Sequence, residues 1–451
     1  MKTRHVDMLN GSITKGLLSL TAPIMIMNVL QTLFNIIDMT VLGNYSNDTA
    51  VGAVGACGTL TVLSTSLLIG ISSGANIIVA RRIGEKNKER TDSAAMTSII
   101  LAIVGGIALM IVGATFSEFF LKLTNCPESL LEKATIYFQM YFYGVPFSLL
   151  YNFAASILRA TGDSKRPMYF LTLAGIVKVL FTFLLVTRFN MDVEGVALAT
   201  IISNIVSCSL AFLTLFKFQN IVHINLSKIR FDFKEFKDIL YIGIPAGLQS
   251  AMYSVANIVI TTAVNGFGKD ATTGIAIANQ FDGILYHIIW APSIAVAPYV
   301  SQNVGAKNIA RVKKTVISAI FITIAFGASF GSLSAIFSGE LSSIVSSNPA
   351  VIAYSQEKMI IISSTYFICG INEVMSGVLR GLGKPIIPTI SIFIFMCLLR
   401  FVWVYAFFPL CPNFTFLYAV WPIGWILSII TLVTAYFIAM RRYKTPTLST
   451  T

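Results

Sequence analysis

Twelve apolar stretches run through the sequence and limit what it can fold into. A helix needs about 20 residues to cross a bilayer, and each stretch has at least that length. Mean hydropathy is +0.78 and only 12% of the residues are charged, which excludes an ordinary soluble domain. The sequence therefore predicts an all-α integral membrane protein with twelve transmembrane helices. The expected spans are residues 17–43, 50–76, 94–116, 133–158, 168–187, 195–216, 238–265, 272–300, 315–337, 352–379, 386–408 and 417–440.

The distribution of Lys and Arg predicts the orientation. Of the 32 basic residues, 25 lie in the two tails, in the central linker and in alternate loops on the same side of the expected spans. Cytoplasmic loops carry such an excess, so we expect both termini inside the cell and the chain in the inner (cytoplasmic) membrane. Five others, including Lys358, fall on the opposite side, and Lys178 and Arg400 fall inside spans. The net charge of +12 thus reflects topology and anionic lipid, not nucleic acid.

The polar N-terminal tail is not followed by a short apolar region with a cleavage site, so we expect the first span to be retained. The six cysteines include no CxxC pair, and isolated thiols in a packed bundle are expected. A bridge between Cys126 and Cys411 would require their loops to meet.

The chain repeats itself with an offset of 221 to 222 residues. LTAPIMIMNVLQTLFNIID resembles YIGIPAGLQSAMYSVANIVI, and ILRATGDSKRP matches VLRGLGKPIIP. Each half holds six spans, an even number, so both halves enter the membrane in the same direction. This predicts two six-helix lobes related by a pseudo-two-fold axis along the membrane normal. We expect lobes at 1–216 and 238–451, joined by a cytoplasmic linker at 217–237 that partly lies on the lipid headgroups.

A polar stripe on the first span predicts a functional site. Asn28, Gln31, Asn35 and Asp38 are spaced to share one helix face. A charge facing lipid costs roughly 2.5–3.5 kcal/mol, so the stripe should face a wet cavity or a partner helix. Pro23 upstream allows the helix to bend. Asp38 is the expected ion-coupling residue, and Asn35 and Lys178 are expected to take part in coupling with it. The alternative is that Lys178 only forms a fixed ion pair with Asp38.

The second half carries different acids. Asp38 aligns with Ile260, whereas Glu373 aligns with Asn152 of the first half. Glu373 is a second ion-coupling candidate, and a structural pair with Arg400 is the alternative. Asp282 could serve function, helix capping or a buried pair. The polar residues expected to contact substrate are Gln31, Asn152, Gln249, Tyr253, Asn257, Asp282 and Tyr366.

Soluble-enzyme motifs are missing from the sequence. It contains no GxxxxGK[ST], no HExxH and no GxSxG. We therefore expect no cofactor, no metal site and no enzymatic activity, and transport would draw on an H⁺ or Na⁺ gradient.

These features resemble the multidrug and toxic compound extrusion (MATE) family of the multidrug/oligosaccharidyl-lipid/polysaccharide flippase superfamily. The resemblance rests on the first span from Pro23 to Asp38, on the LRATGDSKRP and LRGLGKPIIP turns, on EGVALATIIS at 194–203, and on the twelve-span repeat. It implies two lobes around a central cavity, and antiport of amphipathic, often cationic, drugs against H⁺ or Na⁺.

The family's functional residues map only in part. Its first-span Asp corresponds to Asp38 and its sixth-span Thr to Thr200, which the resemblance implies as an ion-coupling residue. Some members carry Asn and Asp in the fifth span, where this chain has Lys178 and Thr182. The tenth-span acid of NorM-like members corresponds to Glu373.

These observations favour an H⁺-coupled exporter of small organic cations that works as a monomer in the lipid bilayer. Na⁺ coupling is the alternative ion, and Lys178 argues against it by charge. A flippase for a lipid-linked saccharide is the alternative substrate class, although it would need a more cationic cavity. A membrane-embedded enzyme or a channel is the remaining alternative.

Overall fold

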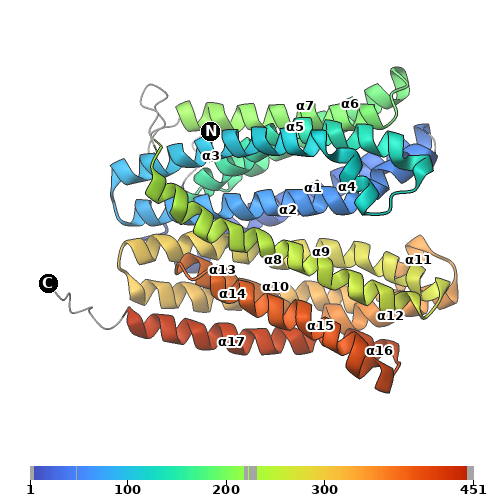
Figure 1. Cartoon of the computed structure of the whole chain (residues 1–451). Helices are drawn as coiled ribbons and strands as arrows, with labels where there is room; N and C mark the ends of the chain where they lie inside the picture. The colour runs from blue at the N-terminus through green and yellow to red at the C-terminus, as the bar shows by residue number, and fades with distance from the viewer. Residues whose placement is uncertain (1–4, 47, 218–221, 223–230, 444–451) are drawn as a thin grey trace. The chain divides into compact units, whose positions relative to one another are not determined.

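The structure is a computed structural model that describes residues 5–46, 48–217, 222 and 231–443 (Figure 1). The described chain is helical throughout, without strands. Ten of the described helices are long and apolar enough to cross a membrane. A pair bent by 48° at Thr365, α12 (Pro349–Ser364) and α13 (Tyr366–Gly381), counts as an eleventh span when taken together. The helix α5 covers the fourth expected span. The prediction of an all-α, twelve-span membrane fold is confirmed.

The helices follow the expected order. Those of the first repeat are α1 Ile13–Tyr45, α2 Asp48–Gly84, α3 Lys88–Thr115, α4 Ser117–Leu123, α5 Glu128–Ala160, α6 Lys165–Arg188 and α7 Val193–Lys217. Those of the second are α8 Phe233–Asn265, α9 Lys269–Gly305, α10 Ile309–Ile336, α11 Ser338–Val345, α12 Pro349–Ser364, α13 Tyr366–Gly381, α14 Ile386–Ile392, α15 Leu399–Val402, α16 Phe414–Tyr418 and α17 Val420–Arg442. Most of the expected linker at 217–237 lies outside the described residues.

The chain forms two compact units, and the division between them falls inside α1 and α8. The first unit contains Ile26–Gly247, whereas Asp7–Met25 belong with the second unit, which continues from Leu248. In both helices the crossover comes three residues after a proline, Pro23 in α1 and Pro245 in α8. The two repeats therefore divide their first long helix at equivalent positions.

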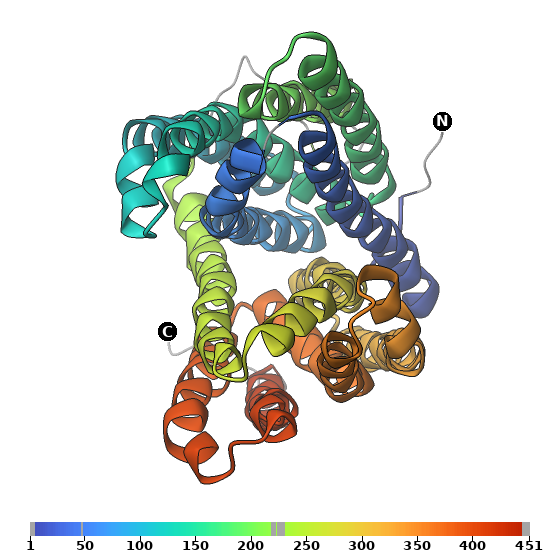
Figure 2. The same ribbon diagram turned by 90° about the vertical axis from the view of Figure 1, so that its right-hand side faces the viewer.

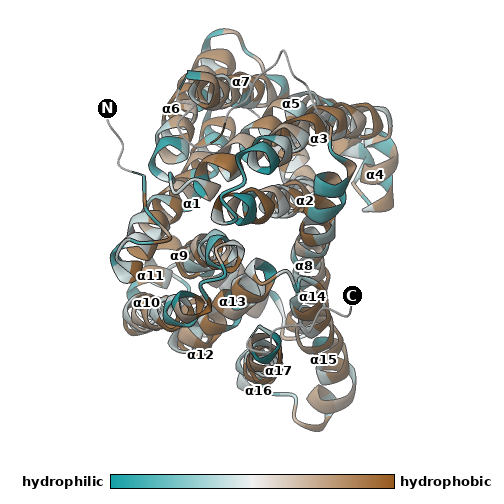
Figure 3. Ribbon diagram, turned by 90° about the vertical axis from the view of Figure 1, so that its left-hand side faces the viewer, coloured by the Kyte–Doolittle hydropathy of each residue, from teal (hydrophilic) through white to brown (hydrophobic). Residues whose placement is uncertain are grey.

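Within the first unit, α5 packs against α2, α3 and α7, and α6 packs against α7 (Figures 1 and 2). Within the second, α9 packs against α10, α12 and α13, and α13 packs against α17. Hydrophobic colour covers most of the length of these helices, and hydrophilic colour gathers at their ends and connecting turns (Figure 3). This pattern is typical of helices surrounded by hydrocarbon.

The repeat extends to backbone conformation. Asn87 caps α3 and Asn308 caps α10, each by accepting a bond from the backbone N–H three residues on. Residues in the left-handed region also recur in pairs 221 positions apart: Lys86 (φ 55°) and Lys307 (φ 57°), and Gly162 (φ 90°) and Gly383 (φ 79°). The sequence similarity between the halves therefore reflects the same turns.

Four glycines let α2 and the first half of α8 approach closely. Gly70 and Gly74 on α2 face Gly243 and Gly247 on α8, each pair in a small-xxx-small spacing. A Cβ added at Gly74 would lie 2.2 Å from the carbonyl oxygen of Ile239. Only glycine fits at this contact.

A buried ion network holds the start of α8 in the first unit. Glu235 is fully buried and accepts bonds from Arg82 at 3.0 Å and from Arg90 at 2.7 Å. Arg82 also pairs with Asp238 at 2.8 Å. Both arginines come from the region around the α2–α3 turn, so this turn fixes where α8 begins.

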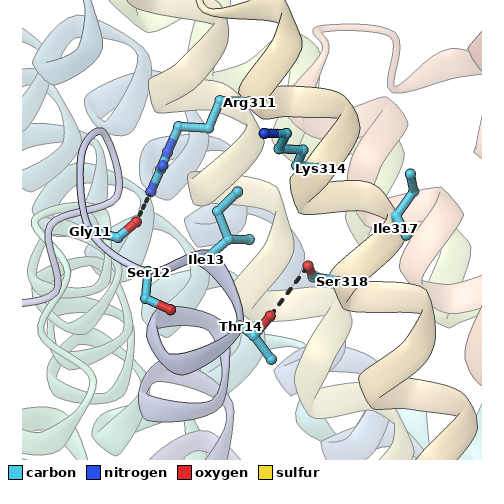
Figure 4. A pocket seen from close by; sticks show the side chains of 8 residues that line it. All are labelled: Gly11, Ser12, Ile13, Thr14, Arg311, Lys314, Ile317 and Ser318. Atoms are coloured by element: carbon cyan, nitrogen blue, oxygen red, sulfur yellow. Dashed lines mark hydrogen bonds between the residues drawn. The ribbon is translucent and has the colours of Figure 1, made fainter.

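The start of α1 is held in a similar way in the second unit. Arg311 of α10 donates to the backbone oxygens of Met8 and Gly11, and Asn303 also donates to Met8 O. A pocket of about 440 Å³ lies beside this contact, between the opening of α1 and α10 (Figure 4). Thr14 of α1 bonds Ser318 of α10 at its far end.

Gly74→Ala should destabilise the protein because its methyl group would collide with the α8 backbone. We expect a loss of about 1–3 kcal/mol in unfolding free energy, typical of overpacking, seen as a lower Tm of the purified protein in detergent. Gly55→Ala on the same helix is the matched control, since nothing lies within 4 Å of its added methyl. Equal melting temperatures for the two variants would contradict the close contact.

Candidate functional site

In the first unit, Asp38 lies at the centre of a small polar cluster. Its side chain is 5% exposed, and Oδ2 lies 2.5 Å from the Nζ of Lys178 on α6. Thr182, one turn further along α6, donates its hydroxyl to Asp38 Oδ1 at 3.0 Å. Lys178 also donates to Asn35 Oδ1 at 3.3 Å. A lysine and a threonine at i and i+4 therefore reach both oxygens of one carboxylate.

Close packing of α1 on α6 positions this cluster. A Cβ at Gly175 would fall 1.8 Å from the Phe34 ring, so the glycine makes room for that ring. Residues 34 and 175 lie about one turn before Asp38 and Lys178, respectively. The contact therefore brings the two charged side chains together.

The arrangement allows Asp38 to exchange partners. An ion pair removed from water depends on both charges, and neutralising one leaves the other uncompensated. Protonation of the carboxylate, or arrival of another cation, would therefore compete with Lys178. The fixed ion pair considered from the sequence is formed in this structure, and it occupies the same atoms that coupling would use.

Two other candidates of the first half donate hydrogen bonds within their own helices. Thr200 donates its hydroxyl to Val196 O of its own helix, and Asn152 donates to Ser148 O of its own helix. Gln31 is exposed. The hydroxyl that bonds Asp38 is therefore that of Thr182, not Thr200. The sequence marks Thr182 only as the fifth-span position where some family members carry Asp, and its bond to Asp38 was not expected.

In the second unit, Glu373 of α13 lies beside α8. It is 4% exposed, and Tyr253 donates its hydroxyl to Glu373 Oε1 at 3.1 Å. Gln249, one turn before Tyr253, instead donates to Thr389 at 2.9 Å. The alternative pairing of Glu373 with Arg400 is not formed in this structure: Arg400 donates to Asn257 Oδ1 at 2.6 Å. Two polar groups of α8 thus separate the acid from the arginine.

A second buried ion pair joins α9 to α12. Lys358 Nζ lies 2.7 Å from Asp282 Oδ2 and also donates to Asn279. Tyr366 donates to the backbone oxygen of Asp282 at 3.4 Å. The outer-side position expected for Lys358 stays a prediction, and the structure adds that this lysine is 4% exposed within α12. Its charge is offset by Asp282, a partner 76 positions away that no local pattern reveals.

Comparisons with known proteins agree on one family. The MatE family model matches residues 23–184 and again 245–406, so it matches each repeat once. The probable multidrug resistance protein YoeA of Bacillus subtilis (strain 168) is 27% identical over 391 residues, 85% of this chain and 84% of that protein. The probable multidrug resistance protein NorM of Thermotoga maritima is 27% identical over 387 residues, 85% of this chain and 83% of that protein.

Solved structures show the same fold. One is described as the outward-facing conformation of a multidrug resistance MATE family transporter of the MOP superfamily. It matches with a TM-score of 0.89 at 20% identity, covering 98% of this chain and 99% of that one. A crystal structure of MATE in complex with MaD3S matches with a TM-score of 0.91. Since the family model covers more than half of the sequence, the chain belongs to the MatE family, the multidrug and toxic compound extrusion transporters.

Proposed function

We propose that this protein is a secondary active efflux antiporter that exports amphipathic, cationic small molecules in exchange for H⁺. The observation that carries the proposal is the buried Asp38, held by Lys178 and Thr182. A carboxylate with a single exchangeable counter-ion is the type of group to which a proton and an organic cation can bind alternately. The names of the relatives, probable multidrug resistance proteins, support drug export.

The mechanism follows from competition for Asp38. In its ionised form the carboxylate binds Lys178 or attracts the cationic substrate. Protonation removes that attraction, and the Pro23 region of α1 repacks as the substrate leaves. A ligand shifts a conformational equilibrium only through different affinities for the two states, and protonation of Asp38 supplies that difference. Alternating access then couples inward proton flow to drug export.

Several polar groups of the second unit are proposed to contact substrate. Tyr253 and Glu373 already share a hydrogen bond, and Asp282 is held by Lys358. We place the protein in the cytoplasmic membrane, with both termini inside the cell, acting as a monomer. Phe and Met are abundant, with 33 and 15 residues, and side chains of these types suit a tolerant apolar pocket.

Asp38→Asn should abolish pH-driven efflux because the amide keeps the shape of the side chain and cannot exchange a proton. Purified protein is placed in liposomes with an imposed pH gradient, and export of a fluorescent organic cation is followed. We expect the rate to fall to that of protein-free liposomes. Glu118→Gln, at an exposed carboxylate of α4 paired only with Lys122, is the matched control. Undiminished efflux by Asp38→Asn would remove Asp38 from the mechanism.

The coupling ion can be decided by imposing the two gradients separately. We expect efflux to follow a pH gradient with Na⁺ equal on both sides, because Lys178 already holds a positive charge beside Asp38 and disfavours a bound metal cation. With pH clamped, a Na⁺ gradient should drive no efflux. The reverse result would assign Na⁺ as the coupling ion.

A further inference from the structure

Arg400 is a deeply buried cation inside a membrane-spanning segment. It lies in α15 and is 2% exposed, the largest fully buried side chain of the described residues. Two π-helical turns flank it, Phe393–Leu398 and Trp403–Phe407. Such turns are rare within helices and are often found at functional sites. Charged side chains within membrane spans likewise tend to serve function.

The partners of Arg400 are neutral. Its Nη1 donates to Asn257 Oδ1 at 2.6 Å, and its guanidinium carbon lies 4.3 Å from the centre of the Trp421 ring. Among the described residues no carboxylate forms an ion pair with it. A guanidinium has five N–H donors, so one amide leaves most of its hydrogen-bonding capacity unused.

Comparison with the first repeat shows which group the Arg400 site lacks. Lys178 binds Asn35 in one half and Arg400 binds Asn257 in the other, and both pairs are 143 residues apart in sequence. A shift of 222 positions therefore carries the amide and the cation of the first site onto those of the second. The same shift carries Asp38 onto Ile260.

The hydroxyl of the first site is also replaced. Thr182, which donates to Asp38, corresponds to Val404. Ile260 belongs to a buried apolar cluster of the second unit, and the partly buried Val404 packs against that cluster. The second repeat has therefore kept the cation and its amide, and has lost the acid and its hydroxyl.

In the described part of the chain, no other acid pairs with Arg400 in place of the one that the second repeat lacks. Glu373, the buried acid of α13, accepts a hydrogen bond from Tyr253 instead. Leaving a buried charge without a compensating partner is costly. An anion that binds at Arg400 would remove this cost, and the exposed Asn257 marks the side from which it can approach.

We propose that Arg400, Asn257 and the Trp421 ring form a binding site for the oxyanion, carboxylate or phosphate, of an amphipathic organic molecule. The planar fork of an arginine suits such groups in a way that a lysine does not. The Asn257 amide nitrogen adds a further donor. This inference rests on the proposed function of drug export. It adds amphipathic molecules with a negatively charged group to the proposed substrates.

Three probes that share one ring system test the site: 1-naphthoate, 1-naphthyl phosphate and 1-naphthylmethylammonium. Their binding to the purified protein in phosphatidylcholine nanodiscs is measured by calorimetry. We expect Arg400→Gln to weaken binding of the carboxylate and the phosphate by about tenfold or more, as the loss of a charged hydrogen bond implies. The affinity of Arg400→Lys for the two anionic probes should lie between that of the unaltered protein and that of Arg400→Gln. Lysine keeps the positive charge but lacks the planar, two-pronged donor group of arginine. The ammonium probe should bind Arg400→Gln at least as well as the unaltered protein.

A second variant tests the site with Arg400 in place. Ile260→Asp restores the acid that the first repeat has at this position, so it should neutralise Arg400 internally and weaken both anionic probes to a similar degree. Leu398→Gln is the matched control, because Leu398 lies on the span that carries Arg400 and is 49% exposed. This variant should bind both anionic probes as the unaltered protein does. Equal melting temperatures confirm that the compared proteins are folded.

Three results would overturn the proposal. One is unchanged binding of both anionic probes in Ile260→Asp or Arg400→Gln. Another is a loss of affinity for the ammonium probe in Arg400→Gln that equals the loss for the anionic probes, which would indicate a general distortion of the protein. The third is Arg400-dependent binding of phosphatidylglycerol alone, which would assign the site to lipid. Intact Arg400-dependent binding of 1-naphthoate with no gradient-driven efflux would refute the proposed antiport and leave this site standing.

Discussion

The cost of holding a charge away from water shapes both functional regions of this protein. In hydrocarbon or in a tightly packed unit, an ionised side chain requires a compensating group beside it to avoid a large cost in free energy. Asp38 meets this requirement with Lys178, and Asp282 meets it with Lys358. The helices that carry these residues, α1 with α6 and α9 with α12, are therefore tied together by charge inside their units. In the proposed mechanism, a change in the protonation of Asp38 alters how α1 and α6 pack.

The internal repeat shows how one scaffold supports two chemistries. The amide on the first helix of each repeat and the cation on the fifth span occupy matching positions, Asn35 with Lys178 and Asn257 with Arg400. Only the first repeat adds an acid between them. The site of the first repeat is an ion pair with no net charge, whereas the matching site of the second repeat has a net positive charge. A few differences at matching positions account for this, although the turns and helix caps of the two repeats are similar.

The sequence was sufficient for the fold because the signals are local and repeated. Apolar length, alternate basic loops and matched turns each depend on neighbouring residues, so helix number and the twofold repeat could be predicted. Asp38 was found because a carboxylate is conspicuous in an apolar span. Its hydroxyl partner was not, since Thr182 and Thr200 are equivalent by composition and only the packing of α1 on α6 selects between them. The burial of Lys358 was missed for the same reason.

The two repeats are not independent, despite their likeness. Residues 7–25 belong to the compact unit of the second repeat, and the start of α8 belongs to that of the first. A fragment made of the first repeat alone would lack Glu235, so Arg82 would lose its buried counter-charge, and Gly74 of α2 would lose its neighbour. Each repeat thus contributes its opening helical segment to the compact unit formed mainly by the other, so that neither repeat alone contains all the residues of one unit.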